Sequence, residues 1–224
     1  MDLFQRLKTD ARPEWSAYVS HEFVEQLGTG SLPEGCFRHY LVQDYLFLIQ
    51  FARAYALGVY KSPTIDDMRA SLEGVKAILD TELDLHIELC AGWGMTRPMI
   101  EAAEEDRPTM AYTRFVLETG MAGDLLDLQV ALAPCIIGYA EIGADLKKRH
   151  AAKIAGNPYR RWIEEYAGDM YQELAREFGI WMDKSAKIYL TESRYPRLAT
   201  IFRKASILEA DFWQMGLDAE ATQR

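Results

Sequence analysis

Four side chains that can transfer protons or act as nucleophiles stand where helical spacing otherwise predicts an apolar, buried face. Steps of three and four residues along their segments place Asp44, His86, Cys135 and Glu209 each among aliphatic and aromatic residues. Tyr139 follows Cys135 by one helical turn, so a thiol and a phenol face the same interior. Burying such a group without a hydrogen-bond partner costs roughly 1–3 kcal/mol, so we expect partners for these groups inside the fold.

The four residues come from four separate segments, which is how helical bundles build substrate, cofactor and metal sites. A thiol is a candidate nucleophile, and carboxyls and an imidazole are candidate general acids and bases. Each residue alone also fits a hydrogen-bonded position in an ordinary core. Two carboxyls and a thiol together are harder to satisfy by packing, and we therefore favour a site.

Pro134 directly precedes Cys135 inside a segment that otherwise has the pattern of one continuous helix. Because proline lacks a backbone N–H, we expect a kink there that widens the space beside the sulfur. The other cysteines, Cys36 and Cys90, are interpreted as ordinary buried residues. The three cysteines lie 54 and 45 residues apart, which fits neither a disulfide framework nor a metal motif and favours a reducing, cytoplasmic setting.

The elements that must position these side chains are all predicted to be helices. Apolar residues recur at helical spacing along nearly the whole chain, and the strict alternation of a half-buried strand is absent. The expected helices are Pro13–Leu27, Glu34–Tyr60, Ile65–Ala91, Thr109–Thr119, Asp124–Ile154, Tyr159–Tyr166, Met170–Ile188 and Arg194–Gly216. No linker or repeat divides the chain, so we predict an all-α, single-domain helical bundle over residues 1–224.

The composition excludes several classes of protein. Of 224 residues, 49% are hydrophobic, which is enough for a packed core, while the formal charge of −9 offers no footprint for nucleic acid. The longest uncharged apolar run, residues 130–140, is well short of the roughly 20 residues needed to cross a bilayer. The first residues, MDLFQRLKTDARPEW, lack the apolar region of a secretory signal. We expect a soluble, cytoplasmic protein that binds neither nucleic acid nor membrane.

Four segments, in this order, resemble the TenA family, also called thiaminase II or aminopyrimidine aminohydrolase. They are Phe37–Phe47 with the pattern Phe-x-x-Tyr-Leu-x-Gln-Asp-Tyr, Pro134–Cys135 followed by Tyr139, Asn157–Tyr166, and Glu209–Met215. His86 and Tyr112 lie between these segments where the family has them, so the resemblance extends over nearly the whole chain. One departure follows Tyr166, where family members often carry a serine, an acidic residue and a phenylalanine, and this chain has Ala-Gly-Asp-Met.

The resemblance implies an all-helical fold shared with haem oxygenase but without haem, assembled as a homotetramer. It implies an enzyme that binds a 4-amino-2-methylpyrimidine and replaces the group on its 5-methylene with hydroxyl. Ammonia is released from 4-amino-5-aminomethyl-2-methylpyrimidine, or a thiazole from thiamine, in thiamin salvage or breakdown. This chemistry needs no cofactor and no metal, and the sequence leaves the preferred substrate open.

The resemblance also implies roles for individual residues. Cys135 is the nucleophile, Glu209 donates and accepts a proton at the pyrimidine, and Asp44 binds its amino and ring-nitrogen edge. Residues expected to line the pocket are Phe47, His86, Tyr112, Tyr139 and Tyr166. Desolvation on an apolar face raises the pKa of a carboxyl, which keeps Glu209 protonated as a general acid, and it raises the pKa of a thiol too. The acceptor of the Cys135 proton is left open among Glu209, His86 and water.

Two alternative functions are weighed against this one. A metal-dependent oxidase on the same scaffold would draw its ligands from His86, Glu82, Asp84 and Glu88. Di-iron bundles carry Glu-x-x-His on two helices, a pattern that the residues before His86 and His39 do not match. A non-catalytic pyrimidine-binding or regulatory protein would bind the pyrimidine without converting it.

Overall fold

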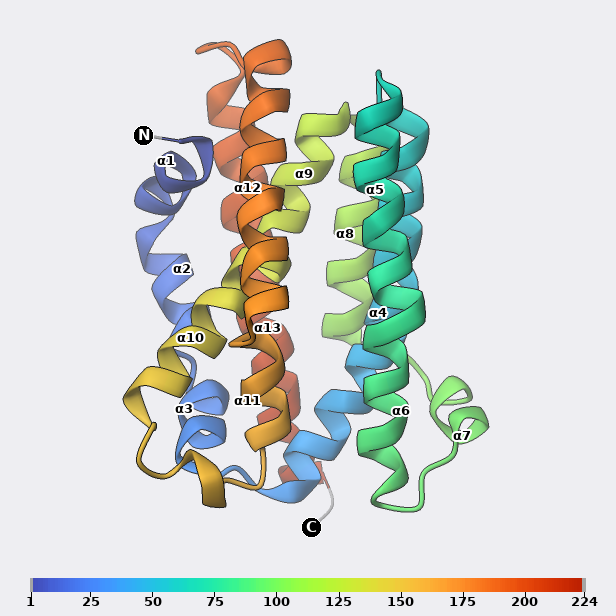
Figure 1. Ribbon diagram of the computed structural model, residues 1–224, viewed down its shortest axis with the longest axis vertical. Coiled ribbons are helices and arrows are strands. Elements are labelled where there is room, and N and C mark those ends of the chain that lie inside the picture. Colours follow the sequence, from blue (N-terminus) through green and yellow to red (C-terminus); the bar gives the residue numbers. More distant parts are fainter. Residues whose placement is uncertain (1, 223–224) are drawn as a thin grey trace.

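The computed structural model describes residues 2–222, and every regular element within that range is helical (Figure 1). The first half contains α1 (Leu3–Asp10), α2 (Arg12–Val19), α3 (Glu22–Thr29), α4 (Glu34–Lys61), α5 (Ile65–Ala77), η1 (Ile78–Glu82), α6 (Leu83–Ala91) and α7 (Arg97–Glu101). The second half contains α8 (Arg107–Ala122), α9 (Leu125–Ala133), η2 (Pro134–Gly138), α10 (Tyr139–Arg149), η3 (Ile154–Gly156), α11 (Arg160–Tyr166), α12 (Asp169–Tyr189) and α13 (Tyr195–Thr222). The prediction of an all-α fold is confirmed.

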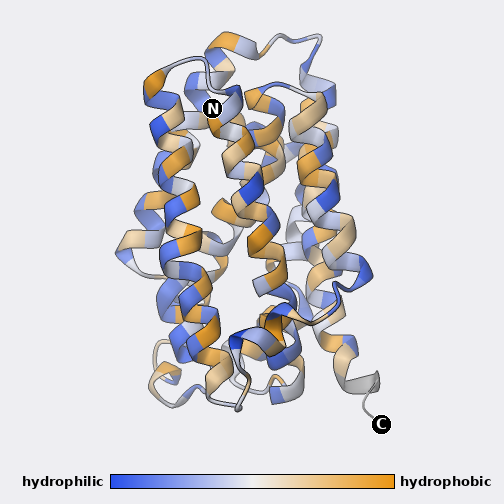
Figure 2. Ribbon diagram, turned by 90° about the vertical axis from the view of Figure 1, so that its right-hand side faces the viewer, coloured by the Kyte–Doolittle hydropathy of each residue, from blue (hydrophilic) through white to orange (hydrophobic). Residues whose placement is uncertain are grey.

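The bundle is organised around α4 and α13, which are 28 residues long each and pack against one another. Helices α5 and α8 also pack on α4, while α2, α8 and α9 pack on α13. Apolar and polar residues alternate around the turns of the outer helices, as the orange and blue bands in Figure 2 show. Such amphipathic helices bury their apolar faces against the central pair. The middle of α4 is therefore surrounded by side chains of other helices.

Two of the long helices predicted from the sequence contain a π-helical segment. The stretch from Ile65 to Ala91 is interrupted by η1, and the stretch from Leu125 to Arg149 is interrupted by η2, which begins at Pro134. Pro134 keeps helical backbone angles (φ −59°, ψ −44°), so the helix continues through it with one wide turn. This is how the fold accommodates the missing N–H for which a kink was expected.

The amino-terminal region differs from the prediction of one helix from Pro13 to Leu27. The structure has separate helices α2 and α3, because the chain turns at Ser20 and His21 Nδ1 accepts a hydrogen bond from the N–H of Phe23 (3.2 Å). Helices α1 and α7 were not predicted, and the fifth expected helix ends at Arg149 rather than at Ile154.

The stretch Leu125–Arg149 is long and apolar enough, by length and composition alone, to cross a membrane. In the structure 89% of its most apolar window is buried inside the bundle. Its hydrophobic character is therefore explained by its place in the core.

Candidate active site

The eight residues predicted for the site come from seven elements that meet in the interior of the bundle. They are Asp44 and Phe47 (α4), His86 (α6), Tyr112 (α8), Cys135 (η2), Tyr139 (α10), Tyr166 (α11) and Glu209 (α13). Seven of the side chains are buried and Cys135 is half-buried. Hydrogen bonds, ring contacts and electrostatic interactions connect all eight, so the structure brings together the residues that the sequence singled out.

Asp44 accepts two hydrogen bonds in the interior, both on Oδ2. The hydroxyl of Tyr40 donates at 2.9 Å, and Nε2 of His86 lies 2.7 Å away. Tyr40 in turn accepts a hydrogen bond from the indole N–H of Trp162 (3.2 Å). The carboxyl is thus held by Tyr40 of its own helix and by His86 of α6, which fixes its orientation.

Both ring nitrogens of His86 contact protein atoms. Nδ1 lies 2.8 Å from the backbone carbonyl of Glu82, which can only accept, so Nδ1 carries a proton. Burial disfavours the charged imidazolium, but the hydrogen bond and charge of Asp44, together with the charge and backbone carbonyl of Glu82, outweigh burial and raise the pKa of His86 above its usual value. In that form His86 donates to Asp44 from Nε2.

Glu209 has one hydrogen bond to a side chain, from the hydroxyl of Tyr112 to Oε1 at 2.8 Å. Burial raises the pKa of Glu209 to about 8, although the hydrogen bond from Tyr112 opposes the shift and the charge of Asp44 adds to it. The carboxyl is therefore mostly protonated at neutral pH, as the sequence analysis expected of a general acid.

Cys135 lies at the second position of the π-helical segment η2. Burial raises the pKa of its thiol well above the usual value, and the charges of Glu209, Glu82 and Asp44 raise it further. Three carboxyls from three elements therefore act electrostatically on this sulfur. The residue as a whole is only half-buried.

Aromatic rings surround the polar groups. The ring of Phe47 lies 5.0 Å from that of Tyr112 and 5.7 Å from that of Phe212. The rings of Tyr139 and Tyr166 lie 4.9 Å apart. Flat walls of this kind suit a planar aromatic ligand.

Sequence reasoning assigned no role in the reaction to Glu82, which belongs to the same cluster. Its Oε1 accepts a hydrogen bond from Tyr166 (3.1 Å), and burial raises its pKa to about 7. Glu82 precedes His86 by one helical turn, but the apolar stripe through His86 passes through Leu83 instead, so no signal in the sequence singles Glu82 out. Tyr171 was missed too: its ring lies 4.8 Å from that of Tyr166, and the charges of Glu82 and Cys135 raise its pKa beyond the effect of burial.

The ligand set weighed for a metal site is not assembled. His86 is buried with both nitrogens in contact with protein, whereas Asp84 and Glu88 are exposed and Glu88 pairs with Arg161 at 3.0 Å. No group of three or more histidine, cysteine or acidic residues in the described part of the chain has the geometry to hold a metal ion. His86 and Glu88 bind other protein groups instead.

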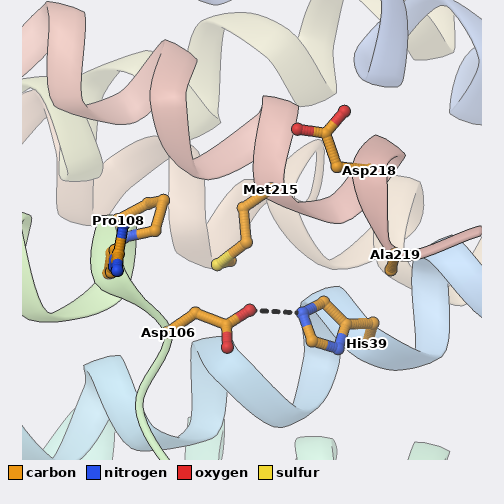
Figure 3. A pocket seen from close by; sticks show the side chains of 7 residues that line it. His39, Asp106, Pro108, Met215, Asp218 and Ala219 are labelled. Carbon is orange, nitrogen blue, oxygen red and sulfur yellow. Dashed lines mark hydrogen bonds and ion pairs between the residues drawn. The ribbon is translucent and has the colours of Figure 1, made fainter. Parts of the chain in front are cut away.

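A surface pocket lies apart from this cluster. His39 contacts Asp106 there at 2.7 Å, and Met215 points into it from α13 (Figure 3). None of the eight predicted residues lines this pocket.

Comparison with known proteins identifies the family. The sequence model of the TENA/THI-4/PQQC family matches residues 8–219. The chain belongs to this family. The TenA resemblance noted in the sequence is thereby confirmed over nearly its whole length.

Two relatives match this chain, one over nearly its own full length and one over part of its length. A protein of Halalkalibacterium halodurans named aminopyrimidine aminohydrolase is 38% identical over 216 residues, which cover 96% of this chain and 95% of that protein. A hydroxymethylpyrimidine/phosphomethylpyrimidine kinase of Saccharomyces cerevisiae is 29% identical over 211 residues, 93% of this chain but only 38% of the kinase.

Two solved structures place the fold. One from Silicibacter sp. TM1040, described as a TenA family transcription regulator, is 43% identical with a TM-score of 0.91 and covers 96% of each chain. Another from Shewanella denitrificans, described as having a heme oxygenase-like fold, is 10% identical with a TM-score of 0.75 and covers 98% of this chain and 93% of that one. The expected haem-oxygenase-like fold of this TenA family chain is confirmed.

Proposed function

We propose that this chain is an aminopyrimidine aminohydrolase of thiamin metabolism. It converts 4-amino-5-aminomethyl-2-methylpyrimidine to the 5-hydroxymethyl compound and ammonia, and it hydrolyses thiamine to the same pyrimidine and its thiazole. One observation carries the proposal: a half-buried thiol, Cys135, lies within electrostatic reach of a protonated carboxyl, Glu209, and of the hydrogen-bonded carboxyl of Asp44. The relative of the same length named for this activity supports it.

In this proposal Asp44 recognises the pyrimidine. His86 and Tyr40 occupy Oδ2, which leaves Oδ1 to accept hydrogen bonds from the 4-amino group. Phe47 and Tyr112 stack against one face of the ring, and Tyr139 and Tyr166 lie at its edge, so the site selects a flat aromatic ligand.

The first chemical step forms a bond between the Cys135 sulfur and a ring carbon. The sulfur gives up its proton and supplies the electron pair of the new C–S bond, while Glu209 transfers its proton to a ring nitrogen. The ring loses its aromaticity, and its electrons then expel the group on the 5-methylene. The C–N bond breaks with its electron pair on nitrogen, which leaves as ammonia or as a neutral thiazole.

The second step restores the ring. Water adds its oxygen to the exocyclic methylene carbon and loses a proton, the C–S bond breaks with its electron pair on sulfur, and Glu209 takes back the proton from the ring nitrogen. The proton lost by water replaces the one that Cys135 gave up. All the acids and bases needed are side chains of the cluster.

The group that first removes the Cys135 proton is best sought among the carboxyls that act on the sulfur. Glu82 joins the earlier set of Glu209, His86 and water, because with a pKa of about 7 it is partly ionised at neutral pH. The raised pKa of Cys135 means that this transfer accompanies substrate binding rather than preceding it.

The proposed product is the substrate of a kinase that carries a segment similar to this chain. The yeast protein that contains a matching segment over 38% of its length is named as a kinase of hydroxymethylpyrimidine. A hydrolase that makes hydroxymethylpyrimidine supplies the substrate of such a kinase, so fusion of the two on one chain is consistent with the proposed reaction.

Three further features of the proposal come from the family resemblance and the sequence. The protein works as a homotetramer, in the cytoplasm, with residues 1–224 as one domain. Light scattering coupled to size-exclusion chromatography tests the first, since a tetramer of the 25.6 kDa chain has about four times that mass.

The proposed function is tested by chromatography of reaction products. The purified chain is incubated separately with the aminomethylpyrimidine and with thiamine, and hydroxymethylpyrimidine is expected from both. The faster substrate distinguishes salvage from degradation. Binding of the pyrimidine without any product would instead assign the chain to the non-catalytic, regulatory class, and loss of both binding and product would refute the proposal.

A further inference from the structure

A groove opens between α5 and α12. Its volume is about 280 Å³. The lining residues, from α4, α5 and α12, are Tyr55, Asp66, Asp67, Ala70, Glu73, Gly74, Leu174, Glu177, Phe178, Trp181 and Lys184. The indole N–H of Trp181 donates to Asp67 Oδ1 (3.0 Å) and joins the two helices across the groove.

The two helix faces that form the groove continue inward to the catalytic cluster. On α12, Trp181, Phe178 and Leu174 follow one another at helical spacing, and the next position on that face is Tyr171, which packs on Tyr166. On the other wall, α5 carries Gly74 and is followed directly by η1, whose last residue is Glu82. The groove and the cluster are therefore outer and inner parts of one interface between helices.

Tyr55 forms the inner wall of the groove. Its side chain is 6% exposed, and its ring packs so closely on Gly74 that a Cβ at that position would overlap it. Burial raises the pKa of Tyr55, and the charges of Cys135 and Glu82 raise it further, so the same side chain that lines the groove also lies within electrostatic reach of the catalytic sulfur.

The charged groups of the groove are mostly acidic. Asp66, Asp67, Glu73 and Glu177 line it, against one lysine, Lys184. Three of these carboxylates also pair with a cation outside the lining: Asp66 with Arg69, Glu73 with Lys76, and Glu177 with Arg176. The lining itself carries four carboxylates against one lysine over a floor of aromatic rings, which together suit a cation with an aromatic body.

We propose that the groove between α5 and α12 is the route by which the substrate reaches Cys135, and that its acidic rim favours substrates with a cationic leaving group. This rests on the proposed function, in which both substrates carry such a group, an ammonium on the aminomethylpyrimidine and a thiazolium on thiamine. The leaving group points along the groove, so that ammonia or the thiazole departs by the same path.

The route is tested by narrowing the groove at an exposed position. Ala70→Phe places a ring at the rim without touching the catalytic cluster, and Ala17→Phe, at an exposed alanine of α2, is the matched control. Stopped-flow fluorescence measures the association and dissociation of hydroxymethylpyrimidine. In Ala70→Phe both rates fall by about 10-fold while Kd changes by less than about 2-fold, because the bound state is untouched.

Other patterns overturn the route. Equal association rates in Ala70→Phe and Ala17→Phe mean that ligands enter elsewhere. A weaker affinity with an unchanged association rate means that the substitution disturbs the bound site instead of the path. Failure of the proposed function is a different result, in which the wild-type chain neither binds the pyrimidine nor converts it.

The charge preference is tested with the double variant Glu73→Gln/Glu177→Gln. It is measured in the Cys135→Ala background so that no turnover follows binding. Association of thiamine slows by about 2- to 5-fold at low ionic strength, and the difference disappears in high salt, whereas association of neutral hydroxymethylpyrimidine is unchanged. Equal slowing of both ligands, or of neither, contradicts a role for the acidic rim.

Discussion

His86 Nε2 lies 2.7 Å from Asp44 Oδ2, and both side chains are buried. Because Nδ1 of the same ring is held by the carbonyl of Glu82 at 2.8 Å, the imidazole is fixed from both sides and cannot turn toward a ligand without breaking one contact. His86 was expected to line the pocket. We now interpret it as a positioning residue, which orients the carboxyl that binds the pyrimidine.

Replacing His86 tests this interpretation. In His86→Leu the buried carboxyl of Asp44 keeps only Tyr40 as a donor, so the free energy of unfolding falls by about 1–3 kcal/mol and pyrimidine binding weakens. In His86→Gln the amide can still donate to Asp44, and part of both losses is recovered. Urea unfolding and ligand titration measure the two effects. Wild-type affinity in His86→Leu would rule out the positioning role.

Glu209 makes the stability of the fold depend on pH in a direction opposite to most carboxyls. In the unfolded chain it ionises near its usual pKa of 4.5, whereas in the folded chain it keeps its proton up to about pH 8. Ionisation therefore favours the unfolded state, and stability is lost as pH rises from about 4.5 to about 8, by up to about 1.4 kcal/mol per pH unit.

The variant Glu209→Gln removes this contribution. Urea unfolding at pH 5.5 and pH 8 is expected to show a larger loss of stability in the wild-type chain than in the variant. Glu82, with a pKa of about 7, contributes a similar loss in both proteins and cancels in the comparison. An identical pH dependence in the two proteins would mean that Glu209 ionises normally.

Tyr112 controls the pKa of Glu209 from the opposite side. Burial raises that pKa, and the hydrogen bond from the Tyr112 hydroxyl lowers it. Tyr112→Phe therefore moves the falling limb of kcat/KM to higher pH, and the lost orientation of the acid lowers the rate at neutral pH by about 10-fold. Tyr45→Phe, which removes a hydroxyl that donates to Glu101 outside the site, serves as control. If the falling limb of the kcat/KM profile has the same pKa in Tyr112→Phe as in the wild type, Glu209 is not the acid.

Gly138 ends the π-helical segment that carries Cys135, and a Cβ there would overlap the ring of Tyr18. The hydroxyl of Tyr18 donates to the carbonyl of Pro134 at the start of the segment (3.2 Å), so the ring has little freedom to move. Gly138→Ala is expected to lower the free energy of unfolding by about 1–3 kcal/mol and to reduce turnover.

The control for that substitution is Gly179→Ala in α12, where an added Cβ meets no atom within 4 Å. Alanine favours a helix over glycine there by about 0.5–1 kcal/mol, so Gly179→Ala should be neutral or stabilising in the same thermal and urea measurements. Equal stability of the two variants would mean that the turn around Pro134 adjusts freely to a larger residue.

Much of this arrangement follows from the spacing of residues in the sequence. Asp44 and Glu209 lie on regular helices, α4 and α13, where steps of three and four residues predict a buried face correctly. Cys135 was found by the same spacing, and Pro134 beside it marked the irregular turn. The polar side chains found on apolar helix faces were correctly expected to cluster, because in the structure they interact with one another.

The role of Glu82 could not be read from the same periodicity. It ends the π-helical segment η1, whose wider turns shift each following side chain around the axis relative to a regular helix. With 3.6 residues per turn, the buried face that contains His86 includes Leu83, and Glu82 is predicted to lie off that face. No proline or glycine marks η1 in the sequence, so only packing against α4 reveals which face is turned inward.

The most direct test of the account is the product assay with Cys135→Ala and Cys135→Ser beside the wild-type chain. The account predicts hydroxymethylpyrimidine from the wild type, a fall in turnover of at least about 1,000-fold in both variants, and pyrimidine binding within about 3-fold of the wild type. Turnover retained by either variant would contradict Cys135 as the nucleophile.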